Sequence, residues 1–250
     1  MINVGILTSC INPNTNIRVV GNIEQRSKDL INNLNFLNKK NIFDYIFIID
    51  SSIDVEFLDQ NKLEKYLLLK GLVYKKNNIF IKFISSPNLN KQIRYKGKGL
   101  SEMKMLIFAI NFIKNKFNDI IFYHKISGRY KFINIDKLVT FNNKIFREKN
   151  KNIILNESYL LQRASTNFYS FSSDFEFDIF NKISEKVDDK FYEYLSVERL
   201  FYSEVINNLL VESYRSKLLP IVDSNLEGGS GQGKLTINRQ LVKNFIYKYF

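Results

Sequence analysis

The chain has 250 residues and a mass of 29.5 kDa, enough for one large domain or two small domains with a full hydrophobic core. Hydrophobic residues make up 45% and charged residues 25%, which argues against intrinsic disorder, and the net charge of +12 indicates an anionic partner or surface. The single cysteine, Cys10, excludes a disulfide framework within the chain, and the single histidine, His124, argues against a histidine-based metal site.

Short apolar runs alternate with amphipathic runs along the first half of the chain. The pattern predicts a strand over residues 3–9, a helix from 23 to 40, strands over 44–50 and 79–85, a helix that opens at 101, and a strand over 119–123. Continuous apolar strands separated by helices predict an α/β fold with a mostly parallel central sheet flanked by helices on both faces. Residues 174–215 are mostly helical in pattern, so we expect a helical C-terminal part.

Three polar segments directly follow predicted strands, namely residues 8–10, 50–54 and 124–129. Ligands of parallel sheets bind beyond the carboxyl ends of the strands, so these segments are the first places to look for a site. A carboxylate at Asp50 can accept a hydrogen bond from the imide of a uracil or from ribose hydroxyls. An aspartate that caps the start of a helix explains the same position.

The turn Gly97-Lys98-Gly99 precedes a helix that opens with Ser101 and Glu102. A glycine-rich turn at the start of a helix can bind a phosphate, because its backbone N–H groups point at the ligand. A plain turn with a solvated basic face explains the same residues.

In residues 124–130, Lys125 and Arg129 flank a Ser-Gly pair. Two cations at a strand end can neutralise a diphosphate leaving group, and a structural ion pair is the alternative for both. A metal held by an Asp-x-Asp motif often has this role, and no such motif occurs at this strand end. We therefore predict a reaction that needs no metal and no other cofactor. His124, beside a buried strand, is more often a structural residue than a catalyst.

The order of these parts resembles that of GT-A-type bacterial glycosyltransferases, which build lipopolysaccharide, O-antigen or capsule. The most specific likeness is a Lys-x-Ser-Gly-Arg-Tyr segment at residues 125–130, and the other matches gain weight from their order along residues 3–234. The residues that carry the likeness are Arg26, Asp50, Ser51, Gly97, Lys98, Gly99, Glu102, Lys125, Ser127, Gly128, Arg129, Tyr130, Asn134, Glu198 and the glycine-rich loop 228–233. One departure is Asp50-Ser51-Ser52, where the family pattern has an acid followed by Asn-Ser.

This resemblance implies transfer of a sugar from a nucleotide-sugar donor, with a UDP-hexose favoured, to a growing glycan or glycolipid acceptor. Glu198 is the candidate general base that deprotonates the acceptor hydroxyl in an inverting reaction. An ion pair on the helix surface is the alternative for Glu198, and a retaining reaction needs no such base. The donor-binding candidates are Thr8, Ser9, Arg26, Asp50, Ser51, Gly97, Lys98, Gly99, Lys125, Ser127, Gly128 and Arg129. The further candidates are Glu102, His124, Tyr130, Asn134, Ser230 and Gly231.

No linker divides the chain, so we expect one domain over residues 1–250, with a nucleotide-binding half over 1–135 and an acceptor-side helical half over 136–250. Residues 228–234 fit the spacing G-x-x-x-x-G-K, but Leu235 stands where Ser or Thr should hold magnesium, which excludes a nucleoside triphosphatase. The loop 228–233 is either a lid over donor phosphates or a plain connector. The basic, amphipathic tail 237–250 can lie on an anionic membrane surface or dock on the core.

No targeting segment is visible and no run approaches the ~20 apolar residues that span a bilayer, so we expect a cytoplasmic protein, at most peripheral to the inner face of the plasma membrane. Two other functions stay open. The 22 Phe and 14 Tyr residues and the charge of +12 suit a nucleic-acid-binding protein. The aromatic residues, however, fall in core-like runs and no binding motif occurs, so no nucleic acid is expected. A catalytically inactive nucleotide-binding relative also fits these residues.

Overall fold

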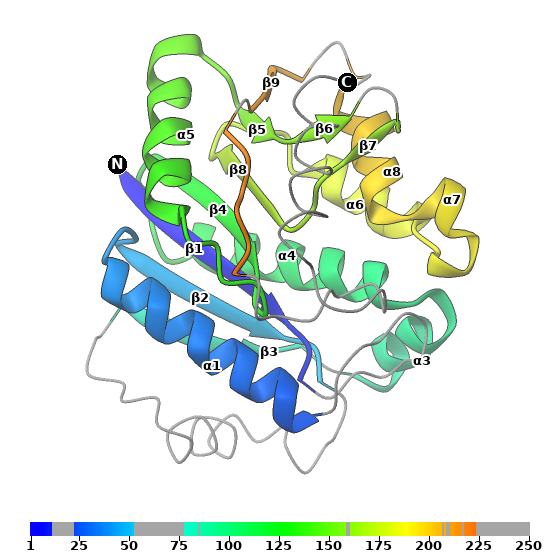
Figure 1. The fold of residues 1–250 in the computed structure, drawn as a ribbon. Coiled ribbons are helices and arrows are strands. Elements are labelled where there is room, and N and C mark those ends of the chain that lie inside the picture. Colours follow the sequence, from blue (N-terminus) through cyan, green and yellow to red (C-terminus); the bar gives the residue numbers. More distant parts are fainter. Residues whose placement is uncertain are drawn as a thin grey trace.

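The computed structural model describes residues 1–11, 23–52, 78–84, 86–158, 161–206, 208, 211–216 and 218–223. These residues form a seven-stranded sheet in the order β3-β2-β1-β4-β8-β5-β9, with helices on both faces (Figure 1). The strands of this sheet are β1 (Ile2–Ser9), β2 (Tyr45–Asp50), β3 (Ile79–Phe83), β4 (Ile121–Ser127), β5 (Ile153–Leu155), β8 (Phe168–Ser172) and β9 (Ser213–Arg215). A separate two-stranded ribbon consists of β6 (Glu157–Ser158) and β7 (Arg163–Ala164).

Most strands of the sheet run in the same direction. β1 pairs in parallel with β2 and β4, and β2 pairs in parallel with β3. β8 is antiparallel to both of its neighbours, β4 and β5, while β5 is parallel to β9. The predicted α/β fold with a mostly parallel sheet is therefore confirmed. Strands from residues 153–215 extend the same sheet as β1–β4, so the second half of the chain is not only helical.

Helices cover both faces of the sheet because its strands are apolar on both sides. On one face, α1 and α5 pack Leu34 and Leu138 into the cluster that contains Leu7 and Ile48. On the other face, Leu106 of α4 and Phe180 of α6 belong to the cluster that contains Val4 and Phe47. The helices are α1 (Ile23–Lys40), α3 (Pro87–Lys96), α4 (Lys98–Lys114), α5 (Ile135–Lys149), α6 (Asp178–Lys186), η2 (Asp189–Phe191), α7 (Tyr192–Leu195), α8 (Val197–Phe201) and η3 (Tyr202–Ile206).

The strand order reverses between β1 and β4. The chain passes from β1 to β2 with α1 on one face, and it returns to β4 with α4 on the opposite face. Such a reversal separates the loops on either side of it, and ligands of open α/β sheets bind in the crevice that results, beyond the carboxyl ends of the strands. The register places Ser9 beside Asp50 and Thr8 beside Ser127, so β1, β2 and β4 end at one edge.

Two element boundaries differ from the sequence prediction in a way that matters for the site. β4 runs to Ser127 rather than ending at residue 123, so His124 and Lys125 lie inside the strand. A lysine can lie inside a buried strand when its charge is paired, and the ammonium group of Lys125 pairs with Glu102. Helix α4 begins at Lys98 rather than at residue 101, so Lys98 and Gly99 are helical.

Several elements were not predicted, among them α3, α5, β5, β8 and β9. The mostly helical pattern of residues 174–215 is confirmed by α6, η2, α7, α8 and η3, up to β9. The glycine-rich loop 228–233 and the tail 237–250 lie outside the described residues. None of the helices in the described ranges is both long enough and apolar enough to cross a membrane.

Candidate functional site

Asp50 organises the carboxyl ends of β1 and β2. Its carboxylate accepts hydrogen bonds from the backbone N–H groups of Ser52, at 2.7 Å, and Ile11, at 3.1 Å. The residue is 1% exposed. Each oxygen of the carboxylate thus accepts one hydrogen bond from the protein's own backbone, and the contact of Asp50 with a uracil or a ribose stays a prediction. This arrangement is closer to the capping alternative, because the Asp50 carboxylate accepts backbone hydrogen bonds that hold a turn in place.

The predicted donor-binding residues at the ends of β1, β2 and β4 do lie together. Ser51 donates its backbone N–H to the Ser9 carbonyl at 3.1 Å, and Gly128 donates its own to the Thr8 carbonyl at 2.8 Å. A Cβ atom on Gly128 would lie 2.9 Å from the Thr8 oxygen, so this close approach of two backbones requires glycine. Ser51 Oγ also lies 2.5 Å from the Ser101 Oγ of α4, which ties the strand ends to that helix.

Lys125 has a different role from the one the sequence predicts. Its side chain is fully buried on the α4 face of the sheet, where the ammonium group forms an ion pair with Glu102. It also donates to the Thr166 carbonyl at 2.5 Å and lies 3.4 Å from Ser127 Oγ. These three acceptors use the hydrogen-bonding capacity of an ammonium group. Lys125 therefore holds Glu102 in place, and the predicted contact with a diphosphate is corrected to the structural ion pair.

Arg129 forms an ion pair with Asp29 of α1. The Arg129 Nη2 and Nε atoms lie 3.0 and 3.1 Å from Asp29 Oδ2, and Gln25 donates to Oδ1 at 2.7 Å. Asn33, one turn further along α1, donates to the Gly128 carbonyl at 2.9 Å. Helix α1 therefore fixes the position of the turn that follows β4, and the Arg129 guanidinium keeps a partly exposed side.

Arg26 brings a second guanidinium group to the same edge. Its Nε donates to the Cys10 carbonyl at 2.7 Å, and the charges of Arg129, Asp50 and Asp29 all act on it. Burial, followed by the nearby Arg129 charge, lowers the pKa of Arg26, while Cys10, Asp50 and Asp29 oppose this shift. Arg26 of α1 and Arg129 of the turn after β4 therefore lie near one another, with the carboxylates of Asp29 and Asp50, at the reversal point of the sheet.

The Gly97-Lys98-Gly99 turn is occupied by a carboxylate of the protein itself. Asp189 Oδ2 accepts the Gly99 backbone N–H at 2.9 Å, at the N-terminus of α4. Gly97 has a φ of +100°, and a Cβ atom there would lie 2.6 Å from Asp189. The predicted phosphate contact at Gly97 and Gly99 is therefore corrected: an anion does bind this helix start, but it is the Asp189 side chain.

A group of charges surrounds Asp189. Burial raises the pKa of Asp189, with smaller raising effects from Glu198 and Glu102, while the Gly99 hydrogen bond and the Lys98 charge lower it. Glu198 lies in the first turn of α8 and is half-buried. No hydrogen bond or ion pair engages its carboxylate within the part of the chain that the structure describes. The surface ion pair considered for Glu198 is therefore absent among these residues.

The remaining candidates serve the fold or lie elsewhere. His124 is fully buried on the α1 and α5 face, where its Nδ1 lies 2.8 Å from Ser170 Oγ, and burial lowers its pKa to about 3. Asn134 donates to the Leu219 carbonyl and accepts from the Ile221 N–H, both at 2.9 Å. Its amide is thus committed to the backbone. The Tyr130 ring packs near Phe132. Ser230 and Gly231 lie outside the described residues.

Sequence reasoning missed three polar residues of this region: Asp29, Ser101 as the partner of Ser51, and Asp189. One signal was present for the first, because Asp29 and Asn33 lie four residues apart on the apolar face of α1 and are both buried. Asp189 shows no such periodic signal. Across the described ranges, no group of three or more His, Cys, Asp or Glu side chains is arranged to hold a metal ion.

No protein-family model and no curated protein matches this chain. A protein from Desulfovibrio desulfuricans G20, provisionally assigned as a nucleotide-diphospho-sugar transferase, is similar over 86% of this chain and 79% of its own, with 10% identity and a TM-score of 0.47. The 4-diphosphocytidyl-2C-methyl-D-erythritol synthase of Anaerococcus prevotii DSM 20548 covers 99% of this chain and 95% of its own, with 11% identity and a TM-score of 0.40. CMP:2-keto-3-deoxy-manno-octonic acid synthetase, complexed with CTP, covers 86% and 90%, with 10% identity and a TM-score of 0.43.

Proposed function

We propose that this protein is a glycosyltransferase that moves a sugar from a nucleotide-sugar donor, with a UDP-hexose as first choice, to a growing lipopolysaccharide, O-antigen or capsule glycan. The observation that carries the proposal is that Arg26, held by the Cys10 carbonyl, and Arg129, held by Asp29, lie near one another at the reversal point of the parallel sheet. This is the place where open α/β sheets bind ligands, and guanidinium groups match the geometry of phosphate oxygens. The acceptor is proposed to be a glycan or glycolipid, and the location to be the cytoplasm or the inner membrane face.

On the donor side, the two guanidinium groups are held before any ligand arrives. Asp29 orients Arg129, and the Cys10 carbonyl orients Arg26. The N-terminus of α1 follows β1 and opens at this same edge, which favours a negative ligand. Preorganised positive charge of this kind stabilises a departing diphosphate without reorganisation during the reaction. We therefore propose that the two arginines, rather than Lys125, neutralise the leaving group and that no metal is required.

On the acceptor side, Glu198 is the proposed general base. Its carboxylate has no ion-pair partner in the described ranges, whereas Glu102 is held by Lys125 and Asp189 caps α4. A base must accept a proton from the acceptor hydroxyl as the hydroxyl attacks the donor sugar, so an unpaired carboxylate suits the role. Glu198 thus differs from its two neighbours in being available for a substrate.

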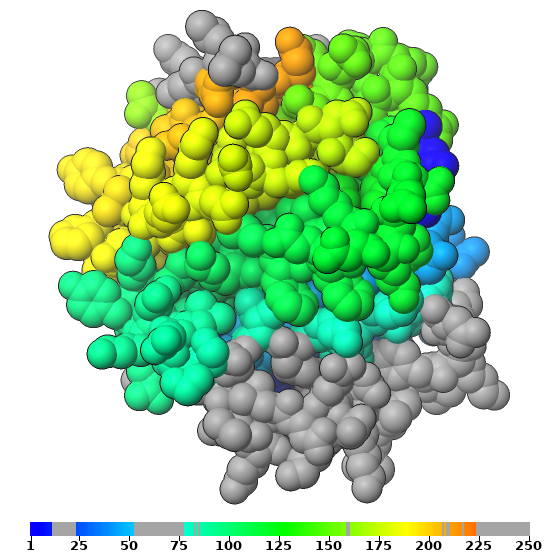
Figure 2. Space-filling model, turned by 180° about the vertical axis from the view of Figure 1, so that it is seen from behind, coloured from blue at the N-terminus to red at the C-terminus, as the bar shows by residue number. Residues whose placement is uncertain are grey.

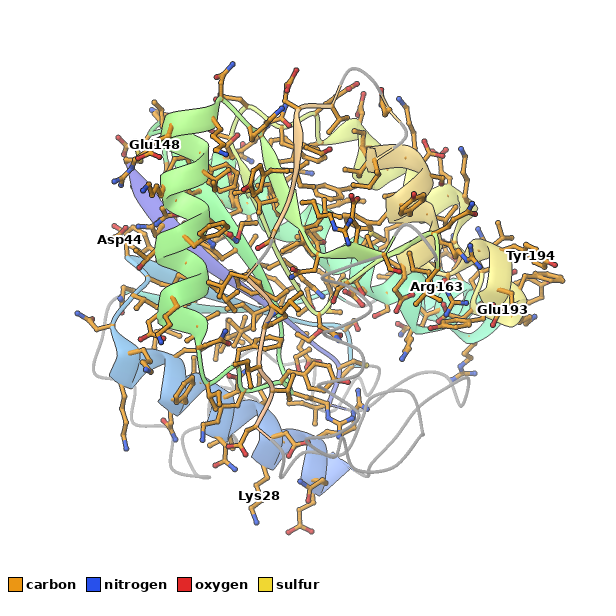
Figure 3. The ribbon with its side chains drawn as sticks, turned by 45° about the horizontal axis from the view of Figure 1, so that its top comes forward. Lys28, Asp44, Glu148, Arg163, Glu193 and Tyr194 are labelled. Carbon is orange, nitrogen blue, oxygen red and sulfur yellow. The ribbon has the colours of Figure 1, made fainter. Side chains whose placement is uncertain are left out.

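Calorimetric titration with UDP, GDP, CMP and a UDP-hexose, first in EDTA and then with Mn²⁺, tests the donor side. We expect one nucleotide to bind in EDTA. Arg26→Gln should weaken that binding by about tenfold or more, since a charged hydrogen bond contributes about 1.5–3 kcal/mol. Lys28→Gln is the matched control, because Lys28 is exposed on the same helix and points away from the sheet (Figure 3).

Release of the nucleoside diphosphate from the donor tests the acceptor side. Glu198→Gln should abolish turnover and leave donor affinity unchanged, whereas Glu148→Gln, on the far end of α5, should change neither (Figure 3). Failure of every nucleotide to bind would overturn the proposed function and favour a nucleic-acid-binding protein. Binding without turnover would identify an inactive relative. Binding that requires Mn²⁺ would keep the transferase and overturn the metal-free reaction.

A further inference from the structure

The most exposed large hydrophobic side chains among the described residues lie at one corner of the molecule. Tyr194, Tyr95 and Phe191 are 80%, 64% and 60% exposed. Tyr95 lies at the end of α3, and Phe191 and Tyr194 belong to η2 and α7, which lie beside α3 (Figure 1). We define the α3–α7 corner as Lys91, Arg94, Tyr95, Lys190, Phe191 and Tyr194.

The helices of the α3–α7 corner hold its side chains outward. Ile93 is buried, which turns the opposite face of α3, with Lys91 and Tyr95 four residues apart, toward solvent. Lys190 Nζ lies 3.3 Å from the centre of the Tyr95 ring and so joins η2 to α3. Tyr194 stands at the edge of the molecule (Figure 3), and α7 projects from the outline beside α3 (Figure 2).

The α3–α7 corner is also positively charged. Lys91, Arg94 and Lys190 are exposed. Two acidic side chains lie close to these cations along the chain. Glu193 forms an ion pair with Arg163 at 2.6 Å, whereas Asp188 accepts the Lys190 backbone N–H at 3.0 Å and keeps its negative charge. Three exposed cations and three exposed aromatic rings thus lie on α3, η2 and α7, and Lys190 contacts the Tyr95 ring directly.

We propose that the α3–α7 corner docks the protein on an anionic phospholipid surface. Tyrosine and phenylalanine enter the headgroup region of a bilayer, and lysine and arginine beside them are attracted to anionic lipids. Proteins that bind single-stranded nucleic acid combine stacking rings with a positively charged groove. The α3–α7 corner projects instead, and a projecting set of rings and cations fits a broad, soft surface better than a strand.

Docking in this way would set the orientation of the candidate site. Asp189, which caps α4 beside Glu198, is the neighbour of Lys190 in η2. A bilayer against the α3–α7 corner would therefore lie close to that side of the site, which is where a lipid-linked acceptor would have to arrive if the proposed function holds. The docking itself does not depend on that function.

Flotation of the full chain with vesicles tests the proposal, using phosphatidylcholine alone or mixed with phosphatidylglycerol. We expect binding only to the anionic vesicles. Lys91→Gln/Lys190→Gln should reduce partitioning by about 25-fold, because each basic side chain near an anionic surface contributes about fivefold. Phe191→Ser/Tyr194→Ser should reduce it by about tenfold or more, since both rings lose their apolar contact. All four side chains are exposed, so the fold should be kept, and circular dichroism checks this.

Matched controls carry the same changes elsewhere on the surface. Lys28→Gln/Lys39→Gln removes two exposed cations of α1, and Ile120→Ser/Ile133→Ser removes two hydrophobic side chains that are 56% and 48% exposed. Both control variants should bind as the wild type does. Equal binding to neutral vesicles, equal losses in the controls, or no binding to either vesicle would overturn the proposal.

Two further outcomes distinguish docking of a membrane by the α3–α7 corner from membrane binding by the tail 237–250 and from nucleic-acid binding. The basic tail 237–250 could bind the vesicles itself, so Arg239→Gln/Lys243→Gln/Lys248→Gln is tested in parallel. If that variant loses all binding while both corner variants bind normally, the α3–α7 corner is not the docking surface. The protein's affinity for polyuridylate is measured as well. If polyuridylate binds more tightly than the anionic vesicles do, and the corner variants lose that binding, nucleic acid is the partner and the proposal is overturned.

Discussion

The Lys125–Glu102 ion pair should respond very differently to removal of its two members. Lys125 is fully buried, whereas the Glu102 side chain is 22% exposed. Glu102→Gln leaves a buried ammonium without a counter-charge, although Gln can still accept a hydrogen bond. Lys125→Met leaves a carboxylate that can turn toward water, and the methionine fills the space of the lysine stem. The first substitution should therefore cost much more stability than the second.

Breaking a buried ion pair so that one charge stays unpaired costs about 3–5 kcal/mol. We expect Glu102→Gln to cost about 3 kcal/mol, at the low end, because one partner is partly exposed. Lys125→Met loses the hydrogen bonds to the Thr166 carbonyl and Ser127 Oγ but leaves no buried charge, so we expect a cost of about 1–2 kcal/mol. The double variant Glu102→Leu/Lys125→Met should be more stable than Glu102→Gln.

Urea unfolding followed by circular dichroism at pH 7 measures these differences, provided that the slope of the transition stays the same. A Lys125→Met variant that is less stable than Glu102→Gln would refute the assignment of Lys125 as a buried structural cation. Nucleotide affinity gives a second readout. Lys125→Met should keep it, because a fully buried ammonium cannot contact a donor, and loss of binding with the fold intact would refute the same reasoning.

Three other residues give separate predictions. Gly97→Ala should lower stability by about 2 kcal/mol or more in thermal unfolding, because it adds the strain of a positive φ and a Cβ atom 2.6 Å from Asp189, and an unchanged midpoint would contradict this. The pKa of His124 is lowered to about 3 in the folded protein, so below pH 6.5 the unfolded chain binds a proton there that the folded chain does not. Stability should therefore decrease as the pH is lowered, by about 2 kcal/mol at pH 5. This loss should be absent in His124→Gln. Asn134→Ala should cost about 2 kcal/mol and make residues 218–223 easier to cleave by proteases, since both bonds of its amide to that segment are lost. Equal proteolysis of variant and wild type would contradict the last prediction.

Local periodicity was enough to find the core of the fold. The apolar runs at the start of the chain correspond to β1 and β2, and the leucines of α1 predict its buried face and its end at Lys40. Periodicity works here because a strand or helix that packs in a sheet must show its buried face within a few successive residues. The edge of the sheet where Ser9, Asp50 and Ser127 meet also followed from the sequence, since parallel strands end on one side.

The role of each charged residue was decided by the tertiary structure alone. Arg129 pairs with Asp29, which lies 100 residues away along the chain. Gly99, at the N-terminus of α4, donates to Asp189, which lies 90 residues away. Even Lys125 and Glu102 are 23 residues apart, on different elements. An ammonium or a carboxylate looks the same in a sequence whether it is paired and buried or exposed to a ligand. Its partner comes from the packing of distant elements, and no local pattern records that partner.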